Sequence, residues 1–202
     1  MRYVIGCEAV AELTVNKSTF LGYVLNVENE SEARQKIELI KKKHFDARHN
    51  CFAYVIDENT VRASDDGEPQ GTAGMPILEV IKSNELNHVL IVVTRYFGGV
   101  LLGTGGLTRA YSKCAALAIN KAGKKEIVSA SILGISCKYP QWAKIEAYLN
   151  KNSVTIGEIK YLDNVNALIY ITEDKENILK HILEITAGEA ELKERGETDI
   201  IK

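Results

Sequence analysis

The sequence lacks several features that mark particular classes of protein. No apolar run approaches the roughly 20 residues that a bilayer-spanning helix needs, and the first residues, MRYVIGCEAV, lack the extended apolar segment of a signal peptide. The net charge of −2 is far from the strongly basic balance that by itself suggests a nucleic-acid-binding protein. These absences predict a cytoplasmic protein without a membrane partner. If the protein binds a polyanion, it does so through a local patch and not through its overall charge.

Cysteine is sparse and scattered. The four cysteines, Cys7, Cys51, Cys114 and Cys137, form no CxxC pair, which argues against a zinc site and, in a reducing compartment, against disulfides. Cys51 follows His49 by two residues, so a catalytic thiol is an alternative, but no asparagine or acid is evidently placed to orient the histidine. We therefore expect free, mostly buried thiols, with no metal and no cofactor.

The most informative segment runs from Val92 to Tyr111 and reads VVTRYFGGVLLGTGGLTRAY. An apolar strand leads into a cluster that contains Arg95 and Tyr96, then into a glycine-rich loop, then into a helix that carries Arg109. Free N–H groups at a glycine-rich helix start form a concave, partly positive site, so the segment predicts an anion site, with phosphate as the favoured anion. Its glycines are Gly98, Gly99, Gly103, Gly105 and Gly106.

Glycine also allows close packing of a strand on a helix, so a purely structural role for these positions stays open. Neither common nucleotide motif is present. No Lys-Ser/Thr pair follows the glycines as a P-loop requires, and Gly103-Thr104-Gly105 has no third glycine at the dinucleotide spacing. A standard nucleotide site is therefore disfavoured.

A second polar segment, residues 62–74, is rich in turn formers and too long for a minimal connection, as functional loops often are. Its carboxylates Asp65, Asp66 and Glu68 suit a divalent cation or acid/base chemistry. The alternative, which we favour, is that they cap the next helix and pair with Arg62, Arg95 or Arg109.

Hydrophobic periodicity predicts two α+β domains, residues 1–130 with a net charge of +1 and residues 131–202 with a net charge of −3. In the first domain Ser31 is the expected N-cap of the first helix, and the alternation near His49 is typical of a strand covered on both faces. The predicted strands are residues 3–15, 20–27, 47–56 and 89–93, and the predicted helices are residues 31–43, 75–82 and 107–122.

The second domain reads as βαββαβ, the ferredoxin-like arrangement, which often binds RNA or protein partners. Its expected strands are residues 127–139, 153–161, 165–171 and 190–196, with helices at residues 140–149 and 174–186. The sheet lacks the aromatic and basic signature of RNA stacking, so we interpret the domain as a positioning or partner-binding module.

Three motifs in this order carry a family resemblance: HNCFAY at His49–Tyr54, DDGEPQGTAGMPILEVI at Asp65–Ile81 and VVTRYFGGVLLGTGGLTRAYSKC at Val92–Cys114. They closely resemble the conserved blocks of the IMPACT/YigZ family. The match covers residue 1 to about residue 130, and the C-terminal part looks like the extra domain of the bacterial members. Gln70, where a small residue is expected, is the one departure noticed.

The resemblance implies a first domain with the fold shared by the second domain of a small-subunit ribosomal protein, the fourth domain of elongation factor G and the galactokinase-type kinases. The glycine-rich phosphate loop of those kinases agrees with an anion site. The C-terminal part also resembles the fifth domain of elongation factor G. Eukaryotic relatives act in translational control through a partner-binding domain that this sequence is expected to lack.

From the residues and the resemblance together we predict a non-catalytic protein that binds RNA, the ribosome or translation factors, and a protein partner through its second domain. The alternative is an enzyme acting on a phosphorylated small molecule, with Asp66, Glu68 and His49 in catalysis. We expect His49, Asp66, Glu68, Arg95 and Arg109 to converge, with the two acids orienting the two arginines. The predicted phosphate-binding residues are His49, Arg95, Arg109 and the five glycines, and the predicted supporting residues are Asp65, Asp66, Glu68, Tyr96 and Tyr111.

Overall fold

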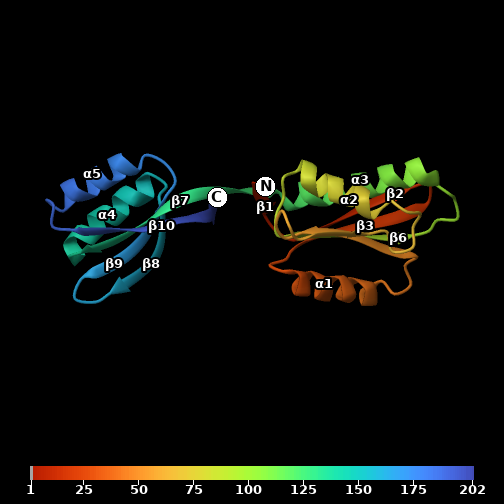
Figure 1. Cartoon of the computed structure of the whole chain (residues 1–202), viewed down its shortest axis with the longest axis horizontal. Coiled ribbons are helices and arrows are strands. Elements are labelled where there is room, and N and C mark those ends of the chain that lie inside the picture. The colour runs from red at the N-terminus through yellow and green to blue at the C-terminus, as the bar shows by residue number, and fades with distance from the viewer. Residues whose placement is uncertain (1) are drawn as a thin grey trace. The chain divides into compact units, whose positions relative to one another are not determined.

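A computed structural model of the chain describes residues 2–202. The chain divides into two compact units, Met1–Glu126 and Ile127–Lys202, and the division falls within strand β7 (Lys124–Cys137). Each unit combines helices with antiparallel strands and has its own hydrophobic core (Figure 1). The protein is therefore a two-unit α+β protein.

The first unit is built on an antiparallel sheet with the strand order β2-β3-β6-β4-β5. Its strands are β2 (Ala9–Val15), β3 (Ser18–Asn26), β4 (His49–Val55), β5 (Val61–Ser64) and β6 (Val89–Tyr96). Helices α2 (Gly74–Ser83) and α3 (Gly103–Ala122) cover one face, and α1 (Glu30–Lys43) covers the other (Figure 1).

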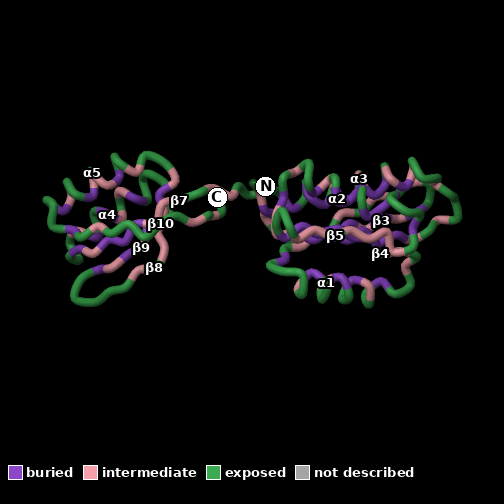
Figure 2. Tube along the Cα trace, in the orientation of Figure 1, coloured by how far each residue is buried: buried purple, intermediate pink, exposed green. Residues whose placement is uncertain are grey.

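Burial on both faces explains why the central strands show no polar alternation. One core lies between the sheet and helices α2 and α3 and contains Ile91 and Tyr111, while a second core lies under α1 and contains Tyr54 and Val92. Strands β4 and β6 are buried along nearly their whole length, as Figure 2 shows in purple. The two-sided strand predicted around residues 47–56 is confirmed.

The structure corrects three boundaries of the first unit. The segment predicted as one strand, residues 3–15, forms two separate strands. The first of them, β1 (Tyr3–Ile5), pairs with Lys124–Glu126 of β7. Helix α1 begins at Glu30, since Asn29 accepts a 3.0 Å hydrogen bond from the Glu32 amide and takes the cap position predicted for Ser31. Helix α3 starts at Gly103 and so includes three of the loop glycines in its first turn.

The second unit has the predicted element order βαββαβ. After β7 come α4 (Tyr139–Lys151), β8 (Thr155–Tyr161), β9 (Val165–Ile171), α5 (Lys175–Ile185) and β10 (Glu191–Ile201). The strands pair in the order β10-β7-β9-β8, and both helices lie on one face of the sheet (Figure 1).

Its core, which includes Trp142, Ile169 and Ile182, lies between the sheet and the two helices. Strand β10 is longer than predicted. A register shift between Glu194 and Glu197, at the positive φ of Gly196, lets the strand continue along β7 past the glycine that was expected to end it. Among residues 2–202, no helix combines the length and the apolar character that crossing a membrane requires.

Candidate functional site

The glycine-rich segment opens a cavity of about 450 Å³, which we call the α3 cavity. Its wall is formed by the start of β4, the turn after β5, the end of β6, the loop 97–102 and the first turns of α3. The lining residues are Arg48, His49, Gly67, Glu68, Pro69, Arg95, Phe97, Leu101, Leu102, Gly103, Thr104 and Leu107.

The start of α3 faces this cavity without the groups that usually neutralise a helix N-terminus. The N-cap residue Leu102 provides no side-chain hydrogen bond, and the first turn contains no acidic residue. The first N–H groups of a helix have no intrahelical acceptor, and the helix dipole adds partial positive charge there. Because Gly103 and Thr104 line the cavity, this end of α3 is chemically suited to an anion.

Arg95 and Glu68 form a buried ion pair at the inner wall. The Arg95 Nη1 atom donates a 2.7 Å hydrogen bond to Glu68 Oε1, and the two side chains are only 6% and 3% exposed. The Tyr111 hydroxyl donates to the same oxygen at 2.7 Å. Removing either charge would leave the other uncompensated in a low-dielectric interior, so the pair is a structural element of the cavity wall.

One atom of this pair stays unpartnered. The Arg95 Nε atom is buried and has no hydrogen-bond partner within residues 2–202. The guanidinium carbon lies 5.5 Å from the ring centroids of both Phe20 and Phe97, so an aromatic ring flanks the guanidinium from each of these positions. A buried donor without an acceptor is costly, so this atom lowers the net stability that the buried pair provides.

The His49 ring lines the cavity and has a neighbour at each nitrogen. Its Nδ1 atom lies 2.8 Å from the backbone oxygen of Asp66, and Nε2 lies 3.9 Å from Glu68 Oε2. Because a carbonyl oxygen can only accept, the geometry assigns the proton to Nδ1 in the neutral ring.

Asp65 organises the loop that carries Glu68. Its carboxylate accepts hydrogen bonds of 2.8 Å from Gly71 N, 3.0 Å from Ala73 N and 2.8 Å from Gly74 N. Burial acts to raise the pKa of Asp65, but these three backbone donors outweigh it and lower the pKa below its ordinary value. The favoured interpretation of the acidic segment, capping of the next helix, is confirmed for this residue.

Asp66 does not orient an arginine, contrary to the prediction. Its carboxylate makes a 2.8 Å ion pair with Lys41 and accepts a 2.7 Å hydrogen bond from the Asn50 amide. The reason is local: Asp66 and Gly67 both have positive φ values, and at this turn the chain places the Asp66 carboxylate beside the end of α1. Of the two acids, Glu68 alone pairs with an arginine in the described residues.

Arg109 does not line the α3 cavity. It lines a neighbouring hollow with Val15, Asn16, Gly106 and Lys113, and this hollow shares Leu102 with the α3 cavity. Six residues along a helix correspond to a rotation of about 240°, so the Cα–Cβ bond of Arg109 leaves α3 on a different side than Gly103. The convergence of Arg109 with the other four residues stays a prediction.

Tyr96 is also separated from the cavity. Successive side chains of a strand point to opposite faces, so Tyr96 points away from Arg95, toward α1. There its hydroxyl lies 2.8 Å from His44 Nδ1 and 3.2 Å from Asp46 Oδ1. Burial and the proximity of Lys43 lower the pKa of His44, and burial and the proximity of Asp46 raise the pKa of Tyr96.

The loop glycines divide into two kinds. A Cβ atom on Gly98 would lie 2.0 Å from the Lys17 backbone, so this glycine serves close packing. Gly99 and Gly103 have φ values of +82° and +67° and face open space. Gly105 is equally free of backbone contact, because its nearest neighbour would be the Arg109 side chain at 3.7 Å. Packing thus explains Gly98, and backbone access for an anion at the other positions stays a prediction.

Cys51 is not poised as a nucleophile. The thiol lies 2.9 Å from the Asp65 carbonyl oxygen and 3.4 Å from the Tyr111 hydroxyl, and the residue is fully buried. Burial raises the pKa of the Cys51 thiol well above its ordinary value, so the reactive thiolate is suppressed. Within residues 2–202, no three or more His, Cys, Asp or Glu side chains gather in a way that would hold a metal ion.

Comparison with known proteins identifies the family. The model of the Impact N-terminal domain matches residues 16–119, which is more than half of the chain. The chain belongs to the IMPACT family. A domain of unknown function, DUF1949, matches residues 135–189 within the second unit.

Bacterial IMPACT family members are similar over most of their length. The chain is 42% identical to the IMPACT family member YvyE of Bacillus subtilis over 186 residues, which cover 91% of this chain and 86% of YvyE. It is 35% identical to YigZ of Escherichia coli over 141 residues, covering 68% and 69% of the two chains. A solved structure described as the crystal structure of an hypothetical protein aligns with a TM-score of 0.60 at 28% identity and covers 95% of each chain.

Eight of the twelve cavity residues of this IMPACT family chain were not included in the predicted site, among them Arg48, Phe97 and Leu101. Arg48 is exposed at the mouth and makes no ion pair within the described residues, while Phe97 and Leu101 form an apolar rim that is 47% and 86% exposed. Sequence reasoning placed Arg48 beside His49 but had no signal that its side chain is unpaired. The exposed apolar residues between Arg95 and Gly103 were the available signal for the rim.

Proposed function

We propose that this IMPACT family protein binds single-stranded RNA without catalysing a reaction, as a cytoplasmic component associated with the ribosome or with translation factors. The observation that carries the proposal is the start of α3, which is uncapped, free of acidic residues and open to the α3 cavity. A phosphate fits this end of the helix because backbone N–H groups and the helix dipole both favour negative charge there.

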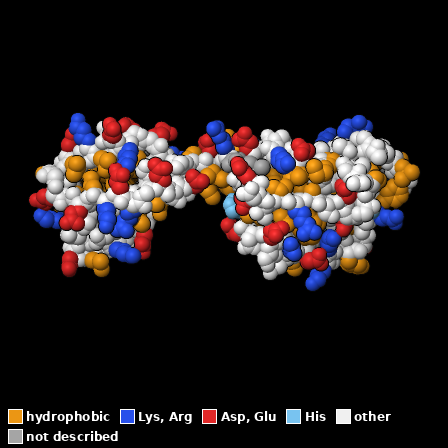
Figure 3. All heavy atoms as spheres, in the orientation of Figure 1, with side chains coloured by type: hydrophobic (Ala, Val, Ile, Leu, Met, Phe, Trp, Pro, Cys, Tyr) orange, Lys and Arg blue, Asp and Glu red, His pale blue; other side chains and the backbone are white. Residues whose placement is uncertain are grey.

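Cationic groups around the helix start support a phosphate ligand. Arg48 lines the cavity, is exposed and makes no ion pair within the described residues, and His49 lines the cavity beside it. Elsewhere, acidic and basic side chains are interspersed over the face seen in Figure 3. The attraction is thus local, and it predicts weak, salt-sensitive binding that is largely independent of sequence.

The apolar rim supports an unpaired nucleotide beside that phosphate. Phe97 and Leu101 present exposed apolar surface next to the cationic groups, and Leu102 and Leu107 continue it inward. Proteins that bind single strands without sequence preference combine a positive groove with aromatic side chains on which bases stack. We assign that stacking role to Phe97.

Family and fold agree with a place in translation. Eukaryotic proteins named IMPACT also match the chain, such as that of Danio rerio at 31% identity over 96 residues, and the resemblance noted from the motifs implies translational control. We further propose the elongation-factor-like fold for the first unit. The strand order β10-β7-β9-β8 fits a ferredoxin-like second unit, which we propose as a partner-binding module.

Amide chemical shifts test the RNA proposal residue by residue. A ¹⁵N-labelled protein would be titrated with a short single-stranded RNA and, separately, with inorganic phosphate. We expect both ligands to shift the amides of Gly103, Thr104 and Gly105, and RNA alone to shift the Phe97 ring signals. Shifts confined to the second unit, or no shifts at low salt, would show that the proposed site is wrong.

A second candidate function is catalysis on a phosphorylated small molecule, favoured by one observation. His49 and Glu68 place Nε2 and Oε2 3.9 Å apart at the cavity wall, and the backbone of Asp66 fixes the imidazole, an arrangement that suits general base chemistry. Incubation with a panel of nucleotides and sugar phosphates, followed by ³¹P NMR, distinguishes the candidates. Turnover that His49→Gln abolishes would favour the enzyme, and an unchanged spectrum favours the binding protein.

A further inference from the structure

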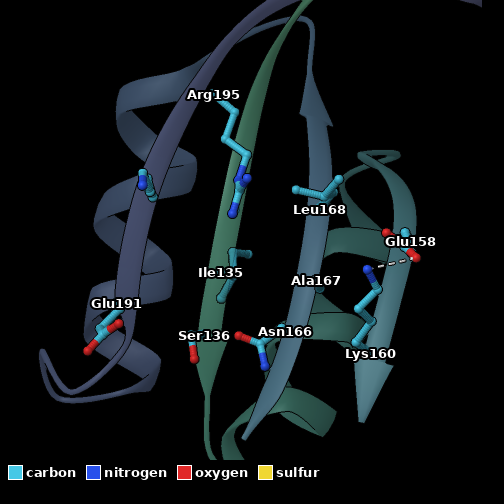
Figure 4. A pocket seen from close by; sticks show the side chains of 11 residues that line it. Ile135, Ser136, Glu158, Lys160, Asn166, Ala167, Leu168, Glu191 and Arg195 are labelled. Atoms are coloured by element: carbon cyan, nitrogen blue, oxygen red, sulfur yellow. Dashed lines mark ion pairs between the residues drawn. The ribbon is translucent and has the colours of Figure 1, made fainter. Parts of the chain in front are cut away.

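Helices α4 and α5 lie on one face of the sheet of the second unit, and no helix of that unit covers the other face (Figure 1). A hollow of about 280 Å³ lies on this face. The hollow lies over Gly134. Because glycine has no side chain, the Arg195 side chain can lie over it, and a Cβ on Gly134 would lie 3.0 Å from Arg195 Nε. In Figure 4, Leu168 and Asn166 project from β9 toward β7 at the edge of this hollow.

The register of the four strands arranges the exposed side chains in two rows that cross the sheet. In the first row, Glu191 on β10 pairs with Ser136 on β7, Ser136 with Asn166 on β9, and Asn166 with Lys160 on β8. This row thus has an acid at the β10 edge and a base at the β8 edge.

The second row lies two residues further along the strands, and the order of its charges is reversed. Lys193 on β10 pairs with Gly134, and Gly134 pairs with Leu168 on β9. Glu158 lies opposite Leu168, within the register shift of β8 between Ile156 and Ile159. This row therefore has a base at the β10 edge and an acid at the β8 edge.

We propose that this face binds the same face of a second copy of the chain, about a two-fold axis that runs parallel to the strands between β7 and β9. Such a rotation places each row of one copy opposite the same row of the other copy. Strand β10 of one copy then faces β8 of the other, and β7 of one copy faces β9 of the other. Two antiparallel sheets that pack face to face lie about 10 Å apart with nearly aligned strands, and a two-fold contact uses one self-complementary patch twice.

The charges match under this operation. Glu191 meets Lys160 of the second copy, and Lys193 meets Glu158 of the second copy, so the contact forms four ion pairs across the axis. Within one copy these charged side chains form few ion pairs. Lys193 has no ion-pair partner in the described residues, and the Lys160–Glu158 pair, at 3.2 Å, joins two side chains that are 60% and 62% exposed, where ion pairs contribute little.

The centre of the face matches as well. Leu168 meets Gly134 of the second copy, where the Arg195 side chain lies over the glycine, and Ser136 meets Asn166, which can exchange hydrogen bonds with it. A hydroxyl thus faces an amide across the axis. The charged residues of this face are two acids and three bases, and acids alternate with bases across it. A patch with both signs interspersed suits a self-complementary contact with a second copy.

A charge swap tests the proposal with the full-length protein. Sedimentation velocity over a concentration series at low salt should show a monomer–dimer equilibrium. Lys193→Glu and Glu158→Lys should each raise the dimer dissociation constant about tenfold or more, because each places like charges opposite one another twice. The double variant restores opposite charges at both contacts and should return the constant most of the way to the wild-type value.

Lys144→Glu on α4 is the matched control, since it makes the same charge change on the covered side of the sheet and should leave the equilibrium unchanged. All the substituted side chains are exposed, so circular dichroism should show an intact fold. A wild-type protein that stays monomeric at every concentration would overturn the proposal. Dimerisation that Lys193→Glu does not weaken, or that the double variant does not recover, would overturn it too.

Discussion

The Arg95 guanidinium donates a 2.7 Å hydrogen bond to the Glu68 carboxylate, and both side chains are almost completely buried. This contact joins the end of β6 to the loop after β5, residues that are 27 positions apart in the sequence. It holds the inner wall of the α3 cavity in place. The ion pair therefore connects the stability of the first unit with the geometry of its binding site.

Breaking the buried pair should be far more costly than breaking an exposed one. Arg95→Met should lower the free energy of unfolding by about 3–5 kcal/mol, because Glu68 is left charged and buried. Adding Glu68→Gln should recover part of this loss, since glutamine still accepts from Tyr111 without a charge. Urea denaturation measures the free energy of unfolding of the single and the double variant.

Lys138→Met provides the control for that experiment. Lys138 pairs with Glu189 at 2.9 Å, but the two side chains are 66% and 53% exposed, so the loss should stay below about 1 kcal/mol. Equal losses for Arg95→Met and Lys138→Met would mean that burial of the Arg95 pair has no energetic consequence.

Asp65→Asn should lower stability by about 1–2 kcal/mol at neutral pH, because three backbone donors lose their charged acceptor. The folded-state pKa of Asp65 is lowered, so the contribution is fully present above the unfolded value of about 4 and is lost as the pH falls through the folded pKa. Thermal melts of both proteins from neutral to acidic pH should therefore converge at low pH. A difference that grows as the pH falls would contradict this assignment.

Substitution by alanine should change the stability of the protein in opposite ways at Gly98 and at Gly105. Gly98→Ala places a Cβ 2.0 Å from the Lys17 backbone and should destabilise the protein by about 3 kcal/mol or more. Gly105→Ala meets no backbone atom and should be neutral or stabilise α3 by up to about 1 kcal/mol. Melting temperatures of the two variants check this, and a destabilised Gly105→Ala would show that this glycine also serves packing.

The accuracy of sequence reasoning follows the range of the contacts involved. The hairpin β2–β3 depends on neighbouring residues, and its pattern is visible in the chain. The start of α3 was placed four residues late, because the glycines of its first turn were assigned to the preceding loop.

The partners of the acids could not be read from local patterns. Asp66 and Glu68 are two residues apart, yet one pairs with Lys41 from α1 and the other with Arg95 from β6. Nothing in their spacing distinguishes these choices, because both partners arrive through tertiary packing. The supporting role of Tyr111 was predicted, and its contact with Glu68 now specifies it.

The thiols should differ sharply in reactivity. Cys7 is exposed, whereas Cys51, Cys114 and Cys137 are buried, and burial raises the pKa of Cys114 to about 12. A chromogenic disulfide reagent at mildly alkaline pH should therefore modify Cys7 rapidly in the native protein and all four thiols only after unfolding. Rapid labelling of Cys51 in the folded protein, identified by peptide mass, would reopen the catalytic-thiol alternative.

The most direct test of the RNA-binding account compares two arginines of the first unit. Fluorescence anisotropy of a labelled single-stranded RNA should show weak binding to the wild-type protein that falls about twentyfold between about 50 and 200 mM salt, as expected for roughly three phosphate contacts. Arg48→Ala should weaken binding about fivefold or more and reduce the salt dependence, whereas Arg109→Ala, outside the α3 cavity, should leave both unchanged. Absent binding at low salt, or equal losses for the two variants, would contradict the assignment of the α3 cavity as the RNA site.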